Sequence, residues 1–265
     1  MKPVTAAALG LVTVLVLSTA PTAEAGDAID FDFLASTPVG SWQEREQAVE
    51  DGGKESVSVM RVKYLGDEER GGEAFAWIET EMSSFKVKKG QRKPQGDRVA
   101  VKFLMKKSLL EGDVVNAVGA FNDLAVEVIM QSGDSQPMRI KGAGSAMGAM
   151  VQAVGLQVEY SFERDGSESV TVPAGTFDCD RYRGQGHSSV KVMIKTVTID
   201  SRSTQWLSEK VPFGIVKAVS DDTVNGKPQH SETTLTAFGT SGATSVITGE
   251  PQDLEMPSLG GLFGG

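Results

Sequence analysis

Apolar and polar residues alternate with a period of two along most of the chain. The clearest run, Ser56 to Leu65, places an apolar side chain at nearly every second position. Such alternation is typical of a strand with one dry and one wet face. Twelve runs of this kind lie at 40–49, 56–65, 73–82, 99–105, 124–131, 156–162, 168–172, 176–182, 190–199, 205–208, 214–220 and 231–238, some of them short, and together they predict about ten strands.

Turn residues separate these runs at short intervals. Asn225-Gly226 is the most specific two-residue hairpin signal, and Asp165-Gly166 is a second. Pro173 to Gly175 and the charged stretch 66–72 are further predicted turns. Hairpins joined in sequence form antiparallel sheets, and a sheet this long must curl to cover its apolar face. We therefore expect a mainly β fold: a single curved antiparallel sheet or half-barrel with one or two short helices.

Two stretches interrupt the β pattern. Residues 106–111 could form a helical turn after the strand at 99–105. Residues 142–155 are small, apolar and uncharged, which fits a short helix, a flexible loop or a lid. We expect loops at 86–98 and 184–189, because both are polar and contain glycine.

The first 25 residues have the three zones of a cleavable export signal. Lys2 is followed by an apolar run, and Ala23-Glu24-Ala25 is a small-x-small cleavage site. The run has about 14 residues, whereas a bilayer span needs about 20, which favours cleavage over a retained anchor. We expect a signal peptide over 1–25, a β-rich domain over 26–240 and a flexible Gly/Pro/Ser-rich tail over 241–265. The mature chain would be periplasmic or extracellular, with no transmembrane span.

Charge and cysteine content narrow the possible partners. The formal net charge is −9, which argues against nucleic acid and anionic lipid headgroups as ligands. Cys179 is the only cysteine, so no intramolecular disulfide can form. Its neighbours Asp178 and Asp180 should raise the pKa of the thiol, which indicates a buried strand residue rather than a reactive group.

Two segments resemble motifs of a known group of proteins. Residues 170–179, with Val-Pro-Ala-Gly-Thr-Phe, and residues 204–217, with Trp206 and Val-Pro-Phe-Gly, are similar to those of uncharacterised bacterial envelope proteins. Those proteins resemble the lipoprotein-carrier (Lol-type) superfamily, whose curved antiparallel sheet cradles acyl chains. The resemblance covers roughly residues 156–238. Its motifs are turns and strands, so it implies a fold and no site residue is carried over from it.

Catalytic and metal-binding patterns are weak. His187 and His230, the only histidines, have no second histidine or cysteine at metal-ligand spacing, and we expect both in exposed loops. No Gly-x-Ser-x-Gly elbow supports a serine hydrolase. Asp178 and Asp180 could share one strand face, but nearby arginines favour a charge-balanced surface. We expect no enzyme, metal or cofactor; a deep polar cleft lined by Asp178, Asp180 and His187 would reopen the question.

The methionine and tryptophan residues suggest an apolar ligand. Methionine is adaptable and common where irregular apolar ligands bind, although it also fills ordinary cores. We expect a pocket between the concave face of the sheet and residues 142–155, with the candidate ligand-binding residues Trp77, Met130, Met147, Met150 and Trp206. The sequence thus predicts an exported, non-enzymatic envelope protein that binds a lipid or acyl chain. The alternative is a structural or protein-interaction module of the cell envelope, with a filled core and no ligand.

Overall fold

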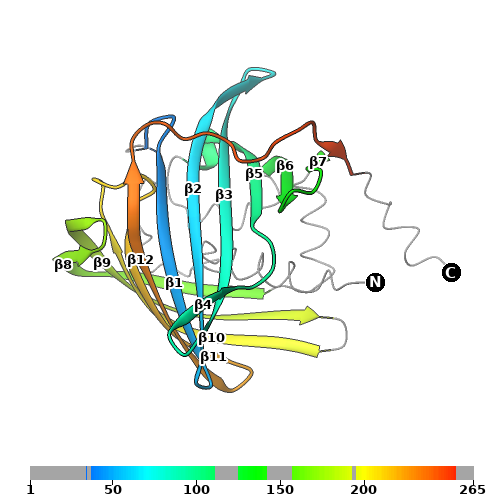
Figure 1. Cartoon of the computed structure of the whole chain (residues 1–265). Helices are drawn as coiled ribbons and strands as arrows, with labels where there is room; N and C mark the ends of the chain where they lie inside the picture. The colour runs from blue at the N-terminus through cyan, green and yellow to red at the C-terminus, as the bar shows by residue number, and fades with distance from the viewer. Residues whose placement is uncertain (1–33, 35–36, 111–124, 142–156, 193–194, 255–265) are drawn as a thin grey trace.

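The computed structural model describes residue 34 and residues 37–110, 125–141, 157–192 and 195–254, which form one sheet of 13 strands (Figure 1). All neighbouring strands pair antiparallel except β13 and β7, which are parallel. The strands are β1 Trp42–Asp51, β2 Lys54–Arg70, β3 Glu73–Lys88, β4 Gln91–Pro94, β5 Val99–Lys106, β6 Ala125–Ser132, β7 Met138–Lys141, β8 Gln157–Val172, β9 Gly175–Val192, β10 Lys195–Leu207, β11 Ile215–Val224, β12 Lys227–Gly239 and β13 Gln252–Asp253.

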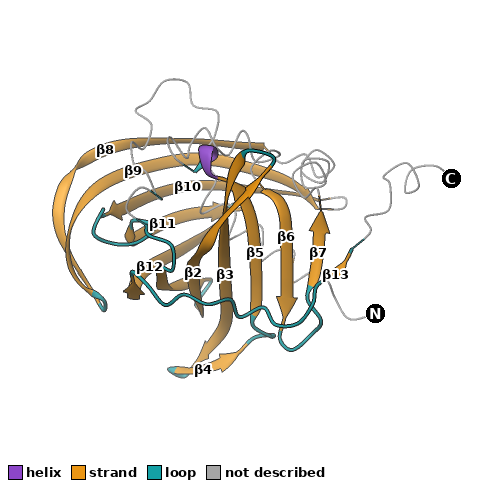
Figure 2. Ribbon diagram, turned by 90° about the horizontal axis from the view of Figure 1, so that it is seen from above, coloured by secondary structure: helices purple, strands orange, loops and turns teal. Residues whose placement is uncertain are grey.

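The sheet is curled but open. Its order is β13-β7-β6-β5-β3-β2-β1-β12-β11-β10-β9-β8, with β4 beside β3, so β13 and β8 are the two ends. Figure 2 shows the sheet bending round so that β8, β9 and β10 lie opposite β3 and β5. Twist accumulates from strand to strand, and a sheet of this many strands cannot stay flat. The predicted curved antiparallel sheet is confirmed.

Helix is nearly absent from the described part of the chain. Its single helical turn is the 3₁₀ segment η1, Lys107–Leu109, within the stretch where a helical turn was predicted. No helix among these residues is long and apolar enough to cross a membrane. The predicted signal peptide at 1–25 and the segment 142–155 lie outside the described residues.

The Asp165-Gly166 pair does not form the predicted hairpin. It lies inside the single long strand β8, where the pairing with β9 shifts register between Arg164 and Ser167. Gly166 has φ 107°, so the pair forms a β-bulge instead of a reversal. The bulge directs the Asp165 carboxylate to Arg181 and Arg183, at 2.9 and 2.7 Å, and these ion pairs join β8 to β9.

The glycine-containing stretch 184–189 is also strand rather than loop. A Cβ at Gly184 would lie 2.4 Å from the ring of Phe162, and one at Gly186 would lie 2.4 Å from the ring of Tyr160. The two rings, on neighbouring β8, stack with centroids 6.0 Å apart. Here glycine makes room for an aromatic ring on the next strand, so it does not mark a turn.

Three smaller predictions also change. Residues 66–70 continue β2 beyond a bulge at Gly66, and the reversal is confined to Gly71 and Gly72. The predicted loop at 86–98 contains the end of β3 and the short strand β4 paired with it. The run 190–199 is divided between β9 and β10.

Alternation along the strands gives the sheet two faces, and the register identifies them. Across β2, β3, β5 and β6, one face carries rows such as Tyr64, Ile78, Phe103 and Val128. This is the concave face, because Phe213 of the β10–β11 loop packs onto its residues Tyr64 and Ile78 from the opposite side of the curl. The other, outer face is crossed by residues 240–254, which run over β2 and β3 to β7 (Figure 1).

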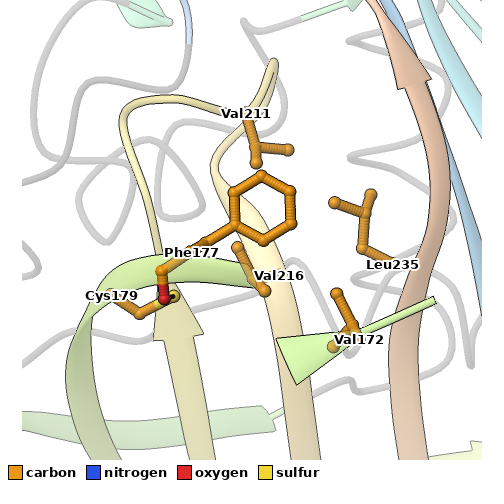
Figure 3. Packing of buried hydrophobic residues seen from close by; sticks show 6 residues of the cluster. All are labelled: Val172, Phe177, Cys179, Val211, Val216 and Leu235. Atoms are coloured by element: carbon orange, nitrogen blue, oxygen red, sulfur yellow. Dashed lines mark hydrogen bonds between the residues drawn. The ribbon is translucent and has the colours of Figure 1, made fainter. Parts of the chain in front are cut away.

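Three apolar clusters make up the core of the described residues. Figure 3 shows the Leu235 cluster, in which the β8–β9 hairpin and the β10–β11 loop meet β11 and β12; it comprises Val172, Phe177, Cys179, Val211, Val216 and Leu235. The Phe213 cluster joins Leu34, Tyr64, Ala76, Ile78 and Phe213. The Val128 cluster comprises Val101, Ala125 and Val128.

The outer face holds a buried ionic network. The side chain of Lys63, only 4% exposed, lies 3.0 Å from Glu79 Oε1 and also pairs with Glu81. Glu79 accepts hydrogen bonds from Ser245 Oγ and from the Val246 N–H. Composition predicted a flexible tail from residue 241, whereas residues 241–254 are bonded to the sheet through such contacts and end in β13; residues 255–265 lie outside the described part.

Candidate functional site

The concave face carries rows of apolar side chains that are only half-buried. Met60 pairs with Met82, which pairs with Val99, and Val101 pairs with Met130, which pairs with Met138. These side chains come from alternate positions of β2, β3, β5, β6 and β7, so they project to one side. Most are of intermediate exposure, and Met138 is 40% exposed. The arrangement gathers these partly exposed apolar side chains on one side of the sheet.

The five sequence-predicted binding residues do not form one group. Met130 lies on the concave face against the Val128 cluster. Trp77 lies on the outer face, three positions along β3 from the concave-face residue Thr80, which pairs with Val101. There its Nε1 donates to Glu68 at 2.7 Å and the Lys102 ammonium lies 4.8 Å from its ring. Met147 and Met150 lie outside the described residues.

Trp206 is engaged in contacts of its own. The side chain packs against the Leu235 cluster, and its Nε1 donates to Glu168 at 2.7 Å. The Lys217 ammonium lies 5.7 Å from the ring centroid. Both tryptophans thus combine a carboxylate acceptor with a lysine over the ring, a pairing that stabilises a partly exposed indole.

The Val-Pro-Phe-Gly segment closes one end of the concave face. Phe213 and Gly214 both have left-handed backbone conformations, with φ 59° and 71°. This geometry turns the chain from β10 into β11 and directs the Phe213 ring onto β2 and β3. Thr37 Oγ1 accepts a hydrogen bond from the Phe213 N–H at 2.9 Å. The motif is therefore a structural clamp across the curl.

Polar side chains interrupt the concave face on β1, among them Gln43 and Arg45. Gln43 is fully buried, and both atoms of its amide lack a hydrogen-bond partner among the described residues. Arg45 lies two positions further along, between Met60 of β2 and Leu235 of β12. Burial lowers the pKa of Arg45 to about 10. No role was predicted from the sequence for Gln43 or Arg45. The pattern that could have revealed them is the polar residue at every second position of the 40–49 run, on the face that alternation predicts to be dry.

A polar groove of about 1270 Å³ lies where β8 to β12 meet the β1–β2 turn. Both histidines line it, and both are in strands rather than the predicted loops, although each remains about half exposed. His187 Nδ1 lies 2.8 Å from Asp200 Oδ1, and His230 Nδ1 lies 2.7 Å from Asp221 Oδ1. The groove thus gathers acidic groups and imidazoles that the sequence placed apart.

The Ser201 hydroxyl in the groove bonds to an aspartate. Ser201 Oγ donates to Asp222 Oδ1 at 2.6 Å, and the neighbouring Ser220 Oγ donates to the same oxygen. Burial raises the pKa of Tyr160, which also lines the groove. Ser201 therefore bonds an aspartate, whereas a Ser-His-Asp mechanism requires a serine hydroxyl bonded to a histidine. No group of three histidine, cysteine or carboxylate side chains in this part of the chain is placed to hold a metal ion.

The structure does not bring Asp178, Asp180 and His187 together in one polar cleft, the arrangement that would have indicated an enzyme. His187 lines the groove, but Asp178 pairs with Lys210 and Asp180 with Arg164 on the surface. Cys179, between these aspartates, is buried, and burial, with a smaller contribution from Asp178 and Asp180, raises the pKa of its thiol to about 11. The expectation of a buried strand residue with a raised thiol pKa is confirmed.

Comparisons with known proteins give similarities of limited extent. A family described as DUF3108-like matches residues 122–234, which include both motifs quoted above. No curated protein matches the chain. A solved structure of a candidate lipoprotein from Parabacteroides distasonis is 17% identical, with TM-score 0.38, over 81% of this chain and 100% of that one. A candidate exported protein with a YmcC-like fold from Bacteroides fragilis is 11% identical, with TM-score 0.36, over 80% and 100%.

Proposed function

We propose that this protein is exported to the cell envelope and binds an apolar ligand, a lipid or acyl chain, on the concave face of its sheet without changing it chemically. The observation that carries the proposal is the half-buried apolar surface of β2, β3, β5, β6 and β7. Exposed apolar surface of this kind is costly in water and commonly marks a binding site. The export signal pattern at residues 1–25 supports the location.

Methionine makes this surface suited to a flexible chain. Met60, Met82 and Met130 lie in adjacent rows, and unbranched thioether side chains adapt to irregular apolar partners. The groove at β8 to β12 supports a chemical role less well, because both of its histidines and the Ser201 hydroxyl are already bonded to aspartates. Binding without catalysis therefore explains the methionine rows of the concave face, which a catalytic groove at β8 to β12 would not.

The proposal is tested with delipidated protein and a fluorescent diacylglycerol, which has acyl chains but no charged head group. We expect saturable uptake by the wild type. Met130→Gln, which places an amide in the apolar row at nearly constant volume, should weaken binding roughly 5- to 10-fold. Trp77→Phe changes the outer face and should leave the affinity unchanged.

The alternative structural module predicts different results. Uptake that never saturates, or equal affinities of wild type and Met130→Gln, would contradict ligand binding at this face. Purification from the native host with a stoichiometric protein partner and no bound lipid would favour the module.

A further inference from the structure

Among the described residues, no acidic side chain pairs with the guanidinium of Arg45. Its acidic chain neighbours, Glu44 and Glu46, project to the outer face because side chains alternate along a strand. There they pair with Arg61 and Arg92, each at 2.6 Å. Across the sheet, Arg45 has the apolar residues Met60 and Leu235 as neighbours.

The surroundings of Arg45 are unsatisfied as well as apolar. Arg45 takes part in no ion pair among the described residues, and its buried Nε has no hydrogen-bond acceptor there. Gln43, on the same face two residues away, adds a buried amide whose two polar atoms have no hydrogen-bond partner in the ranges that the structure describes. A buried charge without a partner opposes folding, and most buried polar groups in proteins are bonded. Arg45 and Gln43 are thus two polar side chains on one face of β1 whose buried polar atoms have no hydrogen-bond partner within the described part of the chain.

We infer that Arg45 and Gln43 bind the carboxylate of a fatty acid whose chain lies along the apolar rows of the concave face. The inference rests on the proposed function and specifies the ligand. A guanidinium presents a planar pair of N–H donors that matches the two oxygens of a carboxylate, and one fixed charge balances one anion. The Gln43 amide can donate a further hydrogen bond.

The apolar rows continue from Arg45 in one direction. Met60 on β2 is its cross-strand neighbour, Met82 on β3 follows, and the Val101–Met130 row lies beyond on β5 and β6. Four strand spacings separate β1 from β6, a path on the order of 19 Å. A long acyl chain can follow this path while its carboxylate stays at Arg45.

The experiment compares oleic acid with oleyl alcohol, which has the same chain and a neutral head group, by calorimetry on the delipidated protein. We expect the wild type to bind oleic acid at least 10-fold more tightly than the alcohol. Arg45→Met should abolish this difference by weakening oleic acid binding roughly 10- to 100-fold, the range for a charge-assisted hydrogen-bonded pair. Arg45→Lys should restore part of it. Arg61→Met, which removes an arginine from the outer face, should retain the full difference.

Folding is followed in the same samples. Because Arg45→Met replaces a partly buried charge that has no partner among the described residues by an apolar side chain, the ligand-free variant should melt no lower than the wild type. Equal affinities of wild type for oleic acid and oleyl alcohol would overturn the inference while leaving the proposed function standing. Failure of both to bind would overturn the proposed function itself. Arg45-dependent binding of phosphatidylglycerol, with no preference for oleic acid, would replace the carboxylate by a phosphodiester.

Discussion

At the scale of single residues, two aromatic rings on β8 can pack only because the residues opposite them on β9 are glycines. Gly184 and Gly186 stand opposite Phe162 and Tyr160 in the register, and each ring occupies the space of the absent Cβ. Neither glycine has a left-handed backbone, so the requirement is steric and not conformational. The aromatic pair can stack only because both glycines are present.

Gly186→Ala should therefore destabilise the fold although alanine favours strand formation more than glycine does. The new Cβ would lie 2.4 Å from the Tyr160 ring and 2.5 Å from the Glu159 carbonyl oxygen, and this oxygen belongs to the backbone and cannot easily move. We expect a loss of about 1–3 kcal/mol in the free energy of unfolding, measured in urea. Gln185→Ala, at the exposed neighbouring position, should change it by less than about 0.5 kcal/mol. An unchanged Gly186→Ala midpoint would contradict the steric account.

At the scale of elements, the segment 240–254 acts as a strap across the outer face. It has little regular structure, yet it supplies two donors to the buried Glu79 carboxylate and one acceptor, the Thr244 carbonyl, to Lys63. Thr248 N–H donates to Gln131 further along. The strap thus satisfies polar groups of β2, β3 and β6 that the sheet leaves incomplete.

Ser245→Ala tests the strap. The variant removes one hydrogen bond from a carboxylate that is fully buried, and hydrogen bonds to charged groups are worth about 1.5–3 kcal/mol. We expect a loss of unfolding free energy of that size by thermal or chemical denaturation. Thr240→Ala, an exposed position at the start of the strap, is the matched control and should have almost no effect. If both variants behave alike, the strap contributes little through Glu79.

At the scale of the whole molecule, one side chain connects the two halves of the curl. Phe213 comes from the loop between β10 and β11, and its ring is buried against β2 and β3, which lie across the concave face. Its φ of 59° is uncommon for a large residue, so the packing must outweigh the backbone cost. The contact joins the β10–β11 loop to the strands that carry the proposed binding face.

Two substitutions of Phe213 separate packing from backbone strain. Phe213→Ala should cost about 3–5 kcal/mol of unfolding free energy, because the ring is buried. Phe213→Gly loses the same ring but accepts a left-handed backbone freely, so it should be more stable than the alanine variant by about 1 kcal/mol. At most positions a glycine variant is less stable than an alanine variant. If Phe213→Gly proves less stable than Phe213→Ala, the loop relaxes out of its left-handed conformation in the variants.

Local pattern alone determined much of this protein. Period-two alternation predicted most of the strands and their antiparallel pairing, and Asn225-Gly226 turns where predicted because both residues have positive φ, 50° and 78°. These properties depend on neighbouring residues, since hairpin geometry and side-chain direction are set within a few positions.

Long-range pairing decided the rest. Asp165-Gly166 forms a bulge because β9 continues to pair with β8 beyond it, and Trp77 and Met130 lie on opposite faces because the register fixes their parity. β1 pairs with β12, near the other end of the described chain, and this pairing leaves Arg45 between Met60 and Leu235. Alternation says that a strand has two faces, but only the curl of the whole sheet decides which face is concave and which charges find partners.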